Sequence, residues 1–343
     1  MRKTIFVALL SVLILSACGG QGKHSGKRGS SGKTLELMVV SDKEVYNTEV
    51  KALVDTLFAM PQPCLPQPEP MFDIVHITKS SFESVDMFRV HRNVVLLDIN
   101  AENNNKVYRH IDKYSVPQVI YDIAAKDQHS LDSLLQKYEK AIKADMYDAE
   151  HKRVWKAYKS EEGIEVQQKL EKDLGISLKL SDKYSIAKLE DGFAWVRIEA
   201  KDFGIGLLIQ RRPYLDKRQL EQPSLLDSID SMMCKVPGPS EGSYMGVERR
   251  RDKETNEYLM PIEVNSVKFP SSLYCAEVRG CWRLFGNFMG GPFVSYSVLT
   301  EDNKEVVTLV GYVYCPRNKP YTKRDLLMQL ESVCYSMEVV KNQ

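Results

Sequence analysis

The sequence predicts an α+β protein in two lobes, with mixed sheets packed against helices and, in the second lobe, an antiparallel meander and a C-terminal helix. Three observations predict this class. A length of 343 residues suggests about two domains. Apolar runs typical of strands are mixed with stretches of helical periodicity, without the strict alternation of a parallel α/β fold. The second half of the chain is richer in strand-like segments than the first.

The first residues have the pattern of an export signal. Arg2 and Lys3 precede a run at positions 5–15 that is apolar apart from Ser11. That run is shorter than the roughly 20 residues of a membrane-spanning helix, but it fits the core of a secretory signal, which takes about 7–15. Positions 15–18 read LSAC, which resembles the lipobox of bacterial lipoproteins. The resemblance implies cleavage after residue 17 and lipidation of Cys18; the alternative is a chance cysteine in an ordinary signal peptide.

Export and lipidation predict a location in the cell envelope. No apolar run after position 18 is long enough to span a bilayer, so the acyl chains on Cys18 are the expected membrane contact, and each buried methylene contributes about 0.8 kcal/mol. In Bacteroidota-type lipoproteins, acidic residues just after the cysteine resemble a surface-export signal, and here none precedes Glu36. We therefore expect the periplasmic face of the outer membrane. Export also excludes nucleic acid as a partner.

Residues 18–33 are predicted to be a lipidated cysteine and a flexible tether. Positions 19–33 contain six glycines, three serines, four basic residues and no apolar residue, so this stretch cannot bury enough surface to fold. Its charge favours an anionic lipid surface, although a solvated spacer is the simpler interpretation. Loss of residues 1–17 removes Arg2 and Lys3, so the formal charge falls from +1 to −1, which leaves no overall excess for binding polyanions.

Residues 34–175 are predicted to form the first lobe. Helical spacing of apolar residues predicts a helix over 46–60, ended by a proline, and a weaker helix over 81–91. Five prolines within residues 61–70 predict a stiff extended loop. Helical periodicity continues from 130 to about 172 with one interruption. Four apolar runs predict strands, at 35–41, 72–78, 93–100 and 118–124.

Residues 176–343 are predicted to form the second lobe, in which antiparallel strands dominate. An Asp-Gly pair at 191–192 predicts a hairpin over 184–200, and a helix with an early proline is expected over 220–235. Thr322 is the expected N-cap of a final helix. The apolar stripe of that helix comprises Leu326, Leu327, Leu330, Val333, Cys334 and Met337. Other strand patterns, the last three forming the meander, are at 203–210, 244–250, 258–269, 273–285, 293–299 and 305–315.

The sequence lacks the motifs that carry catalytic or cofactor chemistry. The six histidines all lie at or before position 151 and have no metal-binding spacing. Residues 204–206 begin like a dinucleotide-binding loop, but the third glycine is missing and the segment reads as a strand. Ser185 and Lys188 have the spacing of penicillin-recognising enzymes, but they also lie in a strand pattern. We therefore expect no metal and no cofactor, and the catalytic residues of any enzymatic activity are unknown.

Six cysteines remain after Cys18, and six thiols in an exported protein allow 15 pairings. Cys275 and Cys281 are too far apart along one strand for a disulfide, and Cys315 lies two strands from Cys275 in a simple meander. Most of the six are expected to be small buried core residues. Cys64, in the proline-rich loop, is the expected reactive thiol.

Three sequence clusters together carry a family resemblance. The first two are residues 65–72 (LPQPEPMF) and 92–95 (RNVV), and the third is 277–282 (EVRGCW) leading to 289–293 (MGGPF). With the lipobox in front, this set resembles the Bacteroidota lipoprotein family catalogued as domain of unknown function 4837, over nearly all of the mature chain. The family carries no established activity, so the resemblance implies lipoprotein status and no mechanism.

The hairpin expected over residues 277–293 offers a speculative ligand groove. Paired glycines and a proline predict a turn at 289–292. Two arginines on one strand face, beside a tryptophan, suggest binding of an anionic or glycan ligand, with the proline-rich loop as the other wall. A hairpin core with a structural turn is the simpler alternative. The residues of the groove are Arg279, Trp282, Arg283, Glu69 and Gln67.

The expected function is that of a membrane-anchored periplasmic lipoprotein that binds an envelope protein or glycan without catalysis. The missing catalytic motifs favour this hypothesis. The alternative is a periplasmic hydrolase of unrecognised type that uses a pair of carboxylates, which one sequence cannot display. Whether the protein is an enzyme is therefore open, with a binding or adaptor role favoured.

Overall fold

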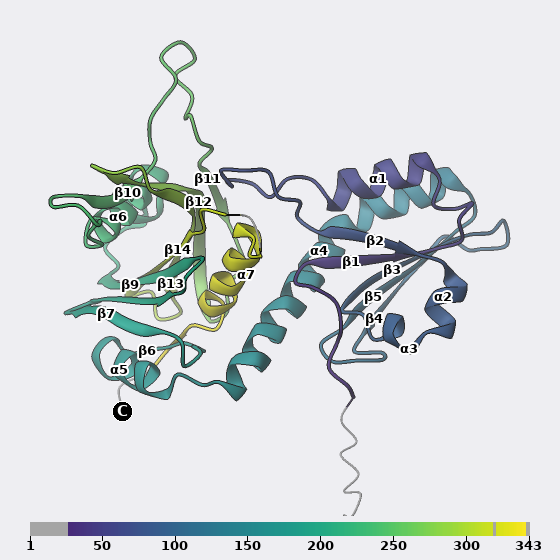
Figure 1. Cartoon of the computed structure of the whole chain (residues 1–343), viewed down its shortest axis with the longest axis horizontal. Helices are drawn as coiled ribbons and strands as arrows, with labels where there is room; N and C mark the ends of the chain where they lie inside the picture. The colour runs from purple at the N-terminus through teal and green to yellow at the C-terminus, as the bar shows by residue number, and fades with distance from the viewer. Residues whose placement is uncertain (1–26, 318–319, 341–343) are drawn as a thin grey trace, which may run out of the picture.

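The computed structural model describes residues 27–317 and 320–340. Figure 1 shows two lobes, each built around its own large sheet, and the long helix α4 (Gln128–Ser160) runs between them. The first sheet uses strands up to residue 125, and the second begins at residue 185. Parallel and antiparallel strands occur together with packed helices, so the predicted α+β class is confirmed.

The first sheet has the strand order β2-β1-β3-β5-β4, and every neighbouring pair is parallel except β4 with β5. Helices α1 (Thr48–Phe58) and α4 cover one face, and the short helices α2 (Lys79–Ser84) and α3 (Asp86–Arg89) lie on the other. The strands are β1 (Glu36–Val40), β2 (Asp73–Ile77), β3 (Asn93–Ile99), β4 (Lys106–Ile111) and β5 (Val119–Ala125).

The local sequence explains most of these elements. The Asn47 side chain caps α1 by accepting hydrogen bonds of 3.0 Å from the backbone N–H groups of Glu49 and Val50. The apolar runs that predict β1, β3 and β5 are buried on both faces, as parallel strands require. The sequence does not predict β4, because it lies at the edge of the sheet and its residues KVYRHI are mostly polar and exposed.

The second sheet has the strand order β10-β12-β13-β14-β9-β8-β7, with β11 paired to β12, and all pairs are antiparallel. Helix α7 (Lys323–Cys334) packs on one face and α6 (Gln222–Met233) on the other. The strands are β7 (Ser185–Glu190), β8 (Phe193–Glu199), β9 (Gly204–Pro213), β10 (Tyr244–Val247), β11 (Glu263–Ser266), β12 (Ser272–Phe285), β13 (Gly290–Thr300) and β14 (Glu305–Tyr314). The remaining elements are α5 (Ile164–Leu174), the 3-10 helix η1 (Lys217–Leu220), β6 (Ile176–Ser177) and β15 (Glu338–Val339).

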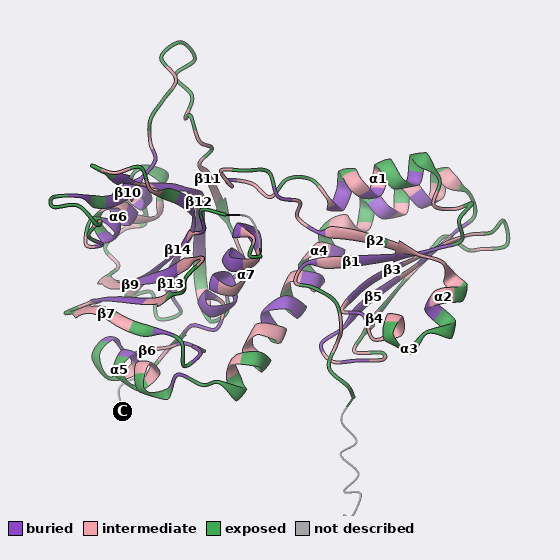
Figure 2. Cartoon of the chain, in the orientation of Figure 1, coloured by how far each residue is buried: buried purple, intermediate pink, exposed green. Residues whose placement is uncertain are grey.

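Helix α7 has the start and the apolar stripe that the sequence predicts. The Thr322 hydroxyl accepts a hydrogen bond of 3.1 Å from the Asp325 backbone N–H and caps the helix. All six predicted stripe residues are buried in the core of the second lobe. Figure 2 shows that α7 and the central strands of this lobe are mostly buried, whereas the edge strand β7 is partly exposed.

The prediction of a turn at residues 289–292 is wrong. Residues from Gly290 onward belong to β13, and the chain turns earlier, at Gly286, where φ is +83°. Gly291 is needed for a close approach instead, because a Cβ there would lie 2.0 Å from the Val313 carbonyl oxygen. The glycine pair therefore allows β13 to pack and does not form the turn.

Residues 28–31, which belong to the predicted tether, have backbone hydrogen bonds to the first lobe. Val116 N–H donates to the Arg28 carbonyl at 2.9 Å, and Ser31 N–H donates to the Val90 carbonyl at 2.9 Å. Arg92 N–H in turn donates to the Ser31 carbonyl at 3.0 Å. Residues 28–31 are thus hydrogen-bonded to the first lobe and are not part of a free spacer. Cys18, the predicted lipidation site, lies outside the described residues, as does the signal segment 1–17.

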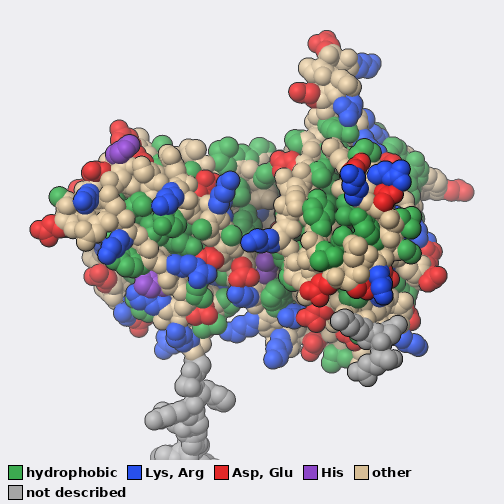
Figure 3. Space-filling model, turned by 180° about the vertical axis from the view of Figure 1, so that it is seen from behind, with side chains coloured by type: hydrophobic (Ala, Val, Ile, Leu, Met, Phe, Trp, Pro, Cys, Tyr) green, Lys and Arg blue, Asp and Glu red, His purple; other side chains and the backbone are tan. Residues whose placement is uncertain are grey.

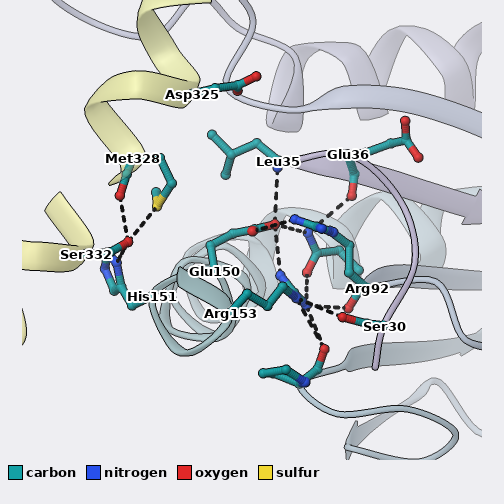
Figure 4. Close-up of polar contacts among 12 residues, drawn as sticks. Ser30, Leu35, Glu36, Arg92, Glu150, His151, Arg153, Asp325, Met328 and Ser332 are labelled. Carbon is teal, nitrogen blue, oxygen red and sulfur yellow. Dashed lines mark hydrogen bonds and ion pairs between the residues drawn. The ribbon is translucent and has the colours of Figure 1, made fainter. Parts of the chain in front are cut away.

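A buried ion-pair network attaches α4 to the first sheet (Figure 4). Glu150 is 1% exposed. Its carboxylate lies 2.8 Å from the guanidinium of Arg92 and 2.8 Å from that of Arg153, and accepts a hydrogen bond of 3.1 Å from the Leu35 backbone N–H. A buried charge with these partners is compensated, whereas removal of one partner leaves the others unpaired.

Helices α4 and α7 also join the two lobes. The imidazole of His151 lies 3.0 Å from the Ser332 hydroxyl, and the indole N–H of Trp155 donates to the Ser332 carbonyl at 2.6 Å. Met328 on α7 is buried in the core of the first lobe, although its neighbours on the helix belong to the core of the second.

In the described part of the chain, no helix has both the length and the apolar character needed to cross a membrane.

Candidate functional site

The second lobe contains an aromatic pocket on the α6 face of its sheet. The cavity has a volume of about 150 Å³. It lies at the end of the sheet where α6 has finished and the loop 236–239 follows. Four aromatic side chains from three strands line it, together with Met245, Leu284 and Met289. These aromatic residues are Trp195, Trp282, Tyr312 and Tyr314.

The register of the strands brings these rings together. Tyr312 is paired with Gly206 on β9, and Gly206 is paired with Arg197 on β8. A Cβ on Gly206 would lie 2.4 Å from the Tyr312 ring, so the missing side chain lets the tyrosine cross β9 and reach β8. There its hydroxyl accepts a hydrogen bond of 2.9 Å from the indole N–H of Trp195.

The rings are held rigidly. The indole N–H of Trp282 donates to the Val313 carbonyl at 3.1 Å, and the Trp282 ring meets the Tyr312 ring edge-on at 5.8 Å between centroids. Burial raises the pKa of Tyr312 well above its usual value, so its phenol stays neutral. Both indole N–H groups are therefore already used within the protein, and the pocket presents mainly carbon surface.

Charged groups lie only at the mouth of the pocket. The guanidinium of Arg197 lies over the Trp195 ring at 4.9 Å and forms an ion pair of 2.8 Å with Glu199. The side chains of Arg197 and Glu199 are 35% and 66% exposed. Next to them, Gly204 leaves open space, since a Cβ there would meet only the Ile198 carbonyl at 3.9 Å. The arrangement fits an apolar group whose polar neighbours remain near the surface.

The size of the cavity limits what can enter it. An engineered cavity of similar volume, about 150 Å³, is large enough for one benzene ring. The pocket can therefore hold one apolar ring or side chain, and not a whole metabolite of cofactor size, which takes several hundred Å³. Within the described residues, no group of three or more ligating side chains could hold a metal ion.

The structure separates the five residues of the speculative groove. Trp282 lines the aromatic pocket, whereas Arg279 and Arg283 lie on the opposite face of β12, because side chains alternate along a strand. Arg279 is buried against Glu277 at 2.9 Å and Glu331 at 2.8 Å. Burial alone would lower the pKa of Arg279, but the charges of Glu331 and Glu277 raise it by more than burial lowers it. The guanidinium therefore stays charged, and both carboxylates that pair with it belong to the protein itself.

The other groove residues also have structural contacts or lie elsewhere. The Glu69 carboxylate accepts hydrogen bonds from the first two backbone N–H groups of α7, at 3.2 Å from Lys323 and 2.8 Å from Arg324. Arg283 lies 3.9 Å from Glu248, and its guanidinium stacks on Phe285 at 4.8 Å. Gln67 is exposed in the proline-rich loop. Of the five residues, only Trp282 lies at a cavity of the second lobe that could take a ligand.

Cys64 does not have the environment of a reactive thiol. Its residue is 6% exposed. Burial, the charge of Glu263 and further neighbours raise its pKa to about 11, which keeps the thiol protonated at neutral pH. The Cys281 thiol donates to the Cys64 carbonyl at 3.4 Å. All six cysteines of the described chain are free thiols, and Cys234 is the exposed one.

A second candidate site lies on the first sheet, where two aspartates on neighbouring strands and Glu83 on α2 line a cleft of about 300 Å³. Asp98 pairs with Ala124 and Asp122 with Leu96, so the two aspartates are diagonal neighbours with Cα atoms about 8 Å apart. Hydrogen bonds from Asn103 and Lys79 lower the pKa of Asp98, whereas burial raises that of Asp122. Opposed shifts of this kind can separate a base from an acid.

The sequence alone did not reveal either candidate site. The one sequence feature that pointed to the aromatic pocket is the period-two spacing of Tyr312 and Tyr314, which places both side chains on one face of a strand. Their approach to Trp195, however, depends on the register through β9, more than a hundred residues away in the chain from Tyr312.

The comparison with protein families gives two matches. Residues 30–159, which include the first sheet and α4, match the family described as Domain of unknown function (DUF8532). Residues 164–336, from α5 to the end of α7, match the family described as Domain of unknown function (DUF4837). No curated protein matches the chain. Since the second match covers just over half of the sequence and contains the aromatic pocket, the chain belongs to the family Domain of unknown function (DUF4837).

Proposed function

We propose that this chain is a non-enzymatic binding or adaptor protein of the cell envelope, held at the membrane by acyl chains on Cys18. Its aromatic pocket takes one apolar side chain of an envelope protein. The lipobox-like sequence at residues 15–18 supports the anchor. The proposed location is the periplasmic face of the outer membrane. Membership of the family supports no particular activity.

The pocket carries the proposal. Its walls are aromatic and aliphatic, its volume of about 150 Å³ suits one ring or side chain, and its indole N–H groups are bonded within the protein. A sugar would need free donors and acceptors inside the cavity, whereas an apolar side chain needs none. Buried anchors of this kind dominate many protein interfaces. The ion pair of Arg197 and Glu199 at the mouth can meet the polar backbone of the partner.

Filling the pocket tests the proposal. Gly204→Val adds a side chain at the lining of the pocket, where its Cβ would meet only the Ile198 carbonyl at 3.9 Å, and a β-branched residue suits a strand. The full-length protein, solubilised in detergent, is used to capture partners from the envelope fraction, which are read by mass spectrometry. We expect one stoichiometric protein in the wild-type capture and its loss with Gly204→Val. Ala200→Val, at an exposed position in the preceding turn, is the matched control and should retain the partner.

Two outcomes contradict the proposal. If Gly204→Val captures the same protein as the wild type, the pocket is not the binding site. If a glycan is retained and no protein is found, the ligand class is wrong. The fluorescence of Trp195 and Trp282 gives a direct check, because a group entering the pocket must change their surroundings.

The anchor has its own test. Cys18→Ala should leave the protein unprocessed or release it from the membrane fraction. A processed protein that stays in the membrane fraction would show that the lipid is not the attachment. This result is independent of the pocket variants.

A carboxylate-dependent hydrolase is the second candidate function, favoured by the opposed pKa shifts of Asp98 and Asp122. Asp122 would act as the acid and Asp98 as the base or nucleophile. The full-length protein is assayed against a panel of fluorogenic glycosides. Turnover that Asp122→Asn and Asp98→Asn both abolish would support this candidate, and turnover unchanged by either substitution would exclude the pair.

A further inference from the structure

A basic face surrounds the point where the described chain begins. Its side chains are all exposed, and the ion pairs next to them are made by other residues, Lys152 with Asp148 and Lys183 with Glu161. No ion pair of the described residues includes a member of the face. Figure 3 shows Lys and Arg side chains gathered around the base of the grey chain. The basic face comprises Lys27, Arg28, Lys156, Lys159 and Lys179.

Three of these lysines line a cavity of about 440 Å³ at the C-terminal end of α4. Trp155 and Tyr158 form its aromatic wall, and the ammonium of Lys179 lies 4.6 Å from the centre of the Trp155 ring. Glu162 is the one acidic residue in its lining. Ammonium groups beside aromatic carbon suit an anionic group that is carried on an apolar body.

The first described residues are attached directly to this end of α4. The Lys156 ammonium donates to the Val116 carbonyl at 3.2 Å, and the Val116 N–H donates to the Arg28 carbonyl at 2.9 Å. The guanidinium of Arg153 donates to the Ser30 hydroxyl at 3.2 Å. Figure 1 shows the first described residues and the end of α4 on the same side of the molecule.

The short stretch of chain between Cys18 and the described residues would bring this side close to a membrane. Nine residue steps separate Cys18 from Lys27, and they span about 30 Å at full extension. An acylated Cys18 would therefore hold the basic face near the headgroups. Lysines at the end of a helix also complement its dipole, which accounts for Lys156 and Lys159, but this does not account for Lys179 or for the cavity.

We propose that the basic face binds the phosphate groups of anionic phospholipids, so that the folded protein lies on the membrane with this side down. The inference rests on the proposed envelope location and goes beyond the aromatic pocket. Lys156, Lys159 and Lys179 hold one headgroup phosphate in the cavity. Lys27 and Arg28 contact neighbouring headgroups where the tether leaves the fold.

The test uses the full-length protein in lipid nanodiscs that contain a phosphatidylcholine with a nitroxide on its headgroup. Trp155 lines the cavity, whereas Trp195 and Trp282 are 6% and 3% exposed in the second lobe, so quenching by the nitroxide reports on Trp155. Discs of phosphatidylcholine alone are compared with discs that also contain phosphatidylglycerol. We expect stronger quenching with phosphatidylglycerol, and loss of that increase in K156Q/K159Q/K179Q.

The matched control removes the same charge elsewhere. K51Q/K140Q/K253Q changes three exposed lysines on α1, the first half of α4 and the loop before β11, and should keep the increase. Equal quenching in both kinds of disc, or an unchanged increase in K156Q/K159Q/K179Q, would overturn the proposal. Loss of the increase at a concentration of free glycerol phosphate no higher than that of the accessible phosphatidylglycerol would also overturn it, because the site would then prefer a soluble ligand to the lipid. A protein without acyl chains would join only the phosphatidylglycerol discs, so failure of the anchor is distinguishable from failure of the basic face.

Discussion

Protonation of His151, which is buried where α4 meets α7, should destabilise the folded protein. The residue is 7% exposed, stacks on Tyr335 at 4.7 Å and lies 3.0 Å from the Ser332 hydroxyl. Ser332 donates its own proton to the Met328 carbonyl at 2.6 Å, so the imidazole is the donor in that contact. Burial lowers the pKa of His151 from 6.5 to about 4, although Asp148 and Glu150 act in the opposite direction. The folded state therefore favours the neutral ring.

The sign and size of the effect follow from this difference in pKa. The unfolded chain takes up a proton near pH 6.5 and the folded chain only near pH 4, so stability falls as the pH decreases through that interval. One pKa unit corresponds to 1.36 kcal/mol, so the full loss is about 3 kcal/mol, of which about 2 kcal/mol is reached at pH 5. Above pH 6.5 the titration of His151 contributes little further change in stability.

The assay compares urea unfolding at pH 7 and pH 5, followed by circular dichroism. His151→Asn keeps a donor near the position of the imidazole nitrogen but cannot titrate. Its loss of stability between the two pH values should be smaller than that of the wild type by about 2 kcal/mol. His129→Asn, at an exposed position in the first turn of α4, should behave like the wild type. An equal loss in His151→Asn and the wild type would refute the reasoning.

Three further predictions concern stability and reactivity. Glu69→Ala removes the acceptor for two backbone N–H groups of α7, and urea unfolding should show a loss of about 2 kcal/mol. Gly291→Ala places a Cβ 2.0 Å from a backbone carbonyl and should cost about 3 kcal/mol or more by the same measurement, whereas Gly204→Ala should cost far less. In the native protein, a thiol reagent should label exposed Cys234 long before Cys64; comparable rates would show that the proline-rich loop opens.

Features that depend on short-range sequence could be predicted well. The start of α7 follows from Thr322, and its buried stripe follows from apolar residues at helical spacing. The hairpin of β7 and β8 turns at Gly192, where φ is +67°, as the Asp-Gly pair predicts. In these cases the residues that decide the structure lie within one or two turns of each other. The edge strand β4 was missed, because one exposed strand has little apolar signal.

The candidate sites depend on contacts between distant segments, which one sequence does not contain. The alternation along β12 already separates Trp282 from Arg279 and Arg283, so a groove that includes all three contradicts the spacing. The carboxylates that occupy Arg279 come partly from α7, more than fifty residues later. Glu69 likewise reaches α7 across about 250 residues. Composition indicates that such charged residues need partners when they are buried, but not which partners they have.

The contacts of α7 join the two lobes of the chain. This helix lies within the DUF4837 match, yet its Met328 is buried in the core of the first lobe. Its Ser332 accepts hydrogen bonds from the side chains of His151 and Trp155 on α4. A fragment limited to residues 164–336 would expose these groups, so the two matched regions are not independent of each other in this protein. Because buried contacts fix one lobe against the other, the aromatic pocket of the second lobe has a fixed orientation relative to the point on the first lobe where the described chain begins. If Cys18 is acylated as proposed, the chain would therefore present its pocket at a limited range of orientations to the membrane.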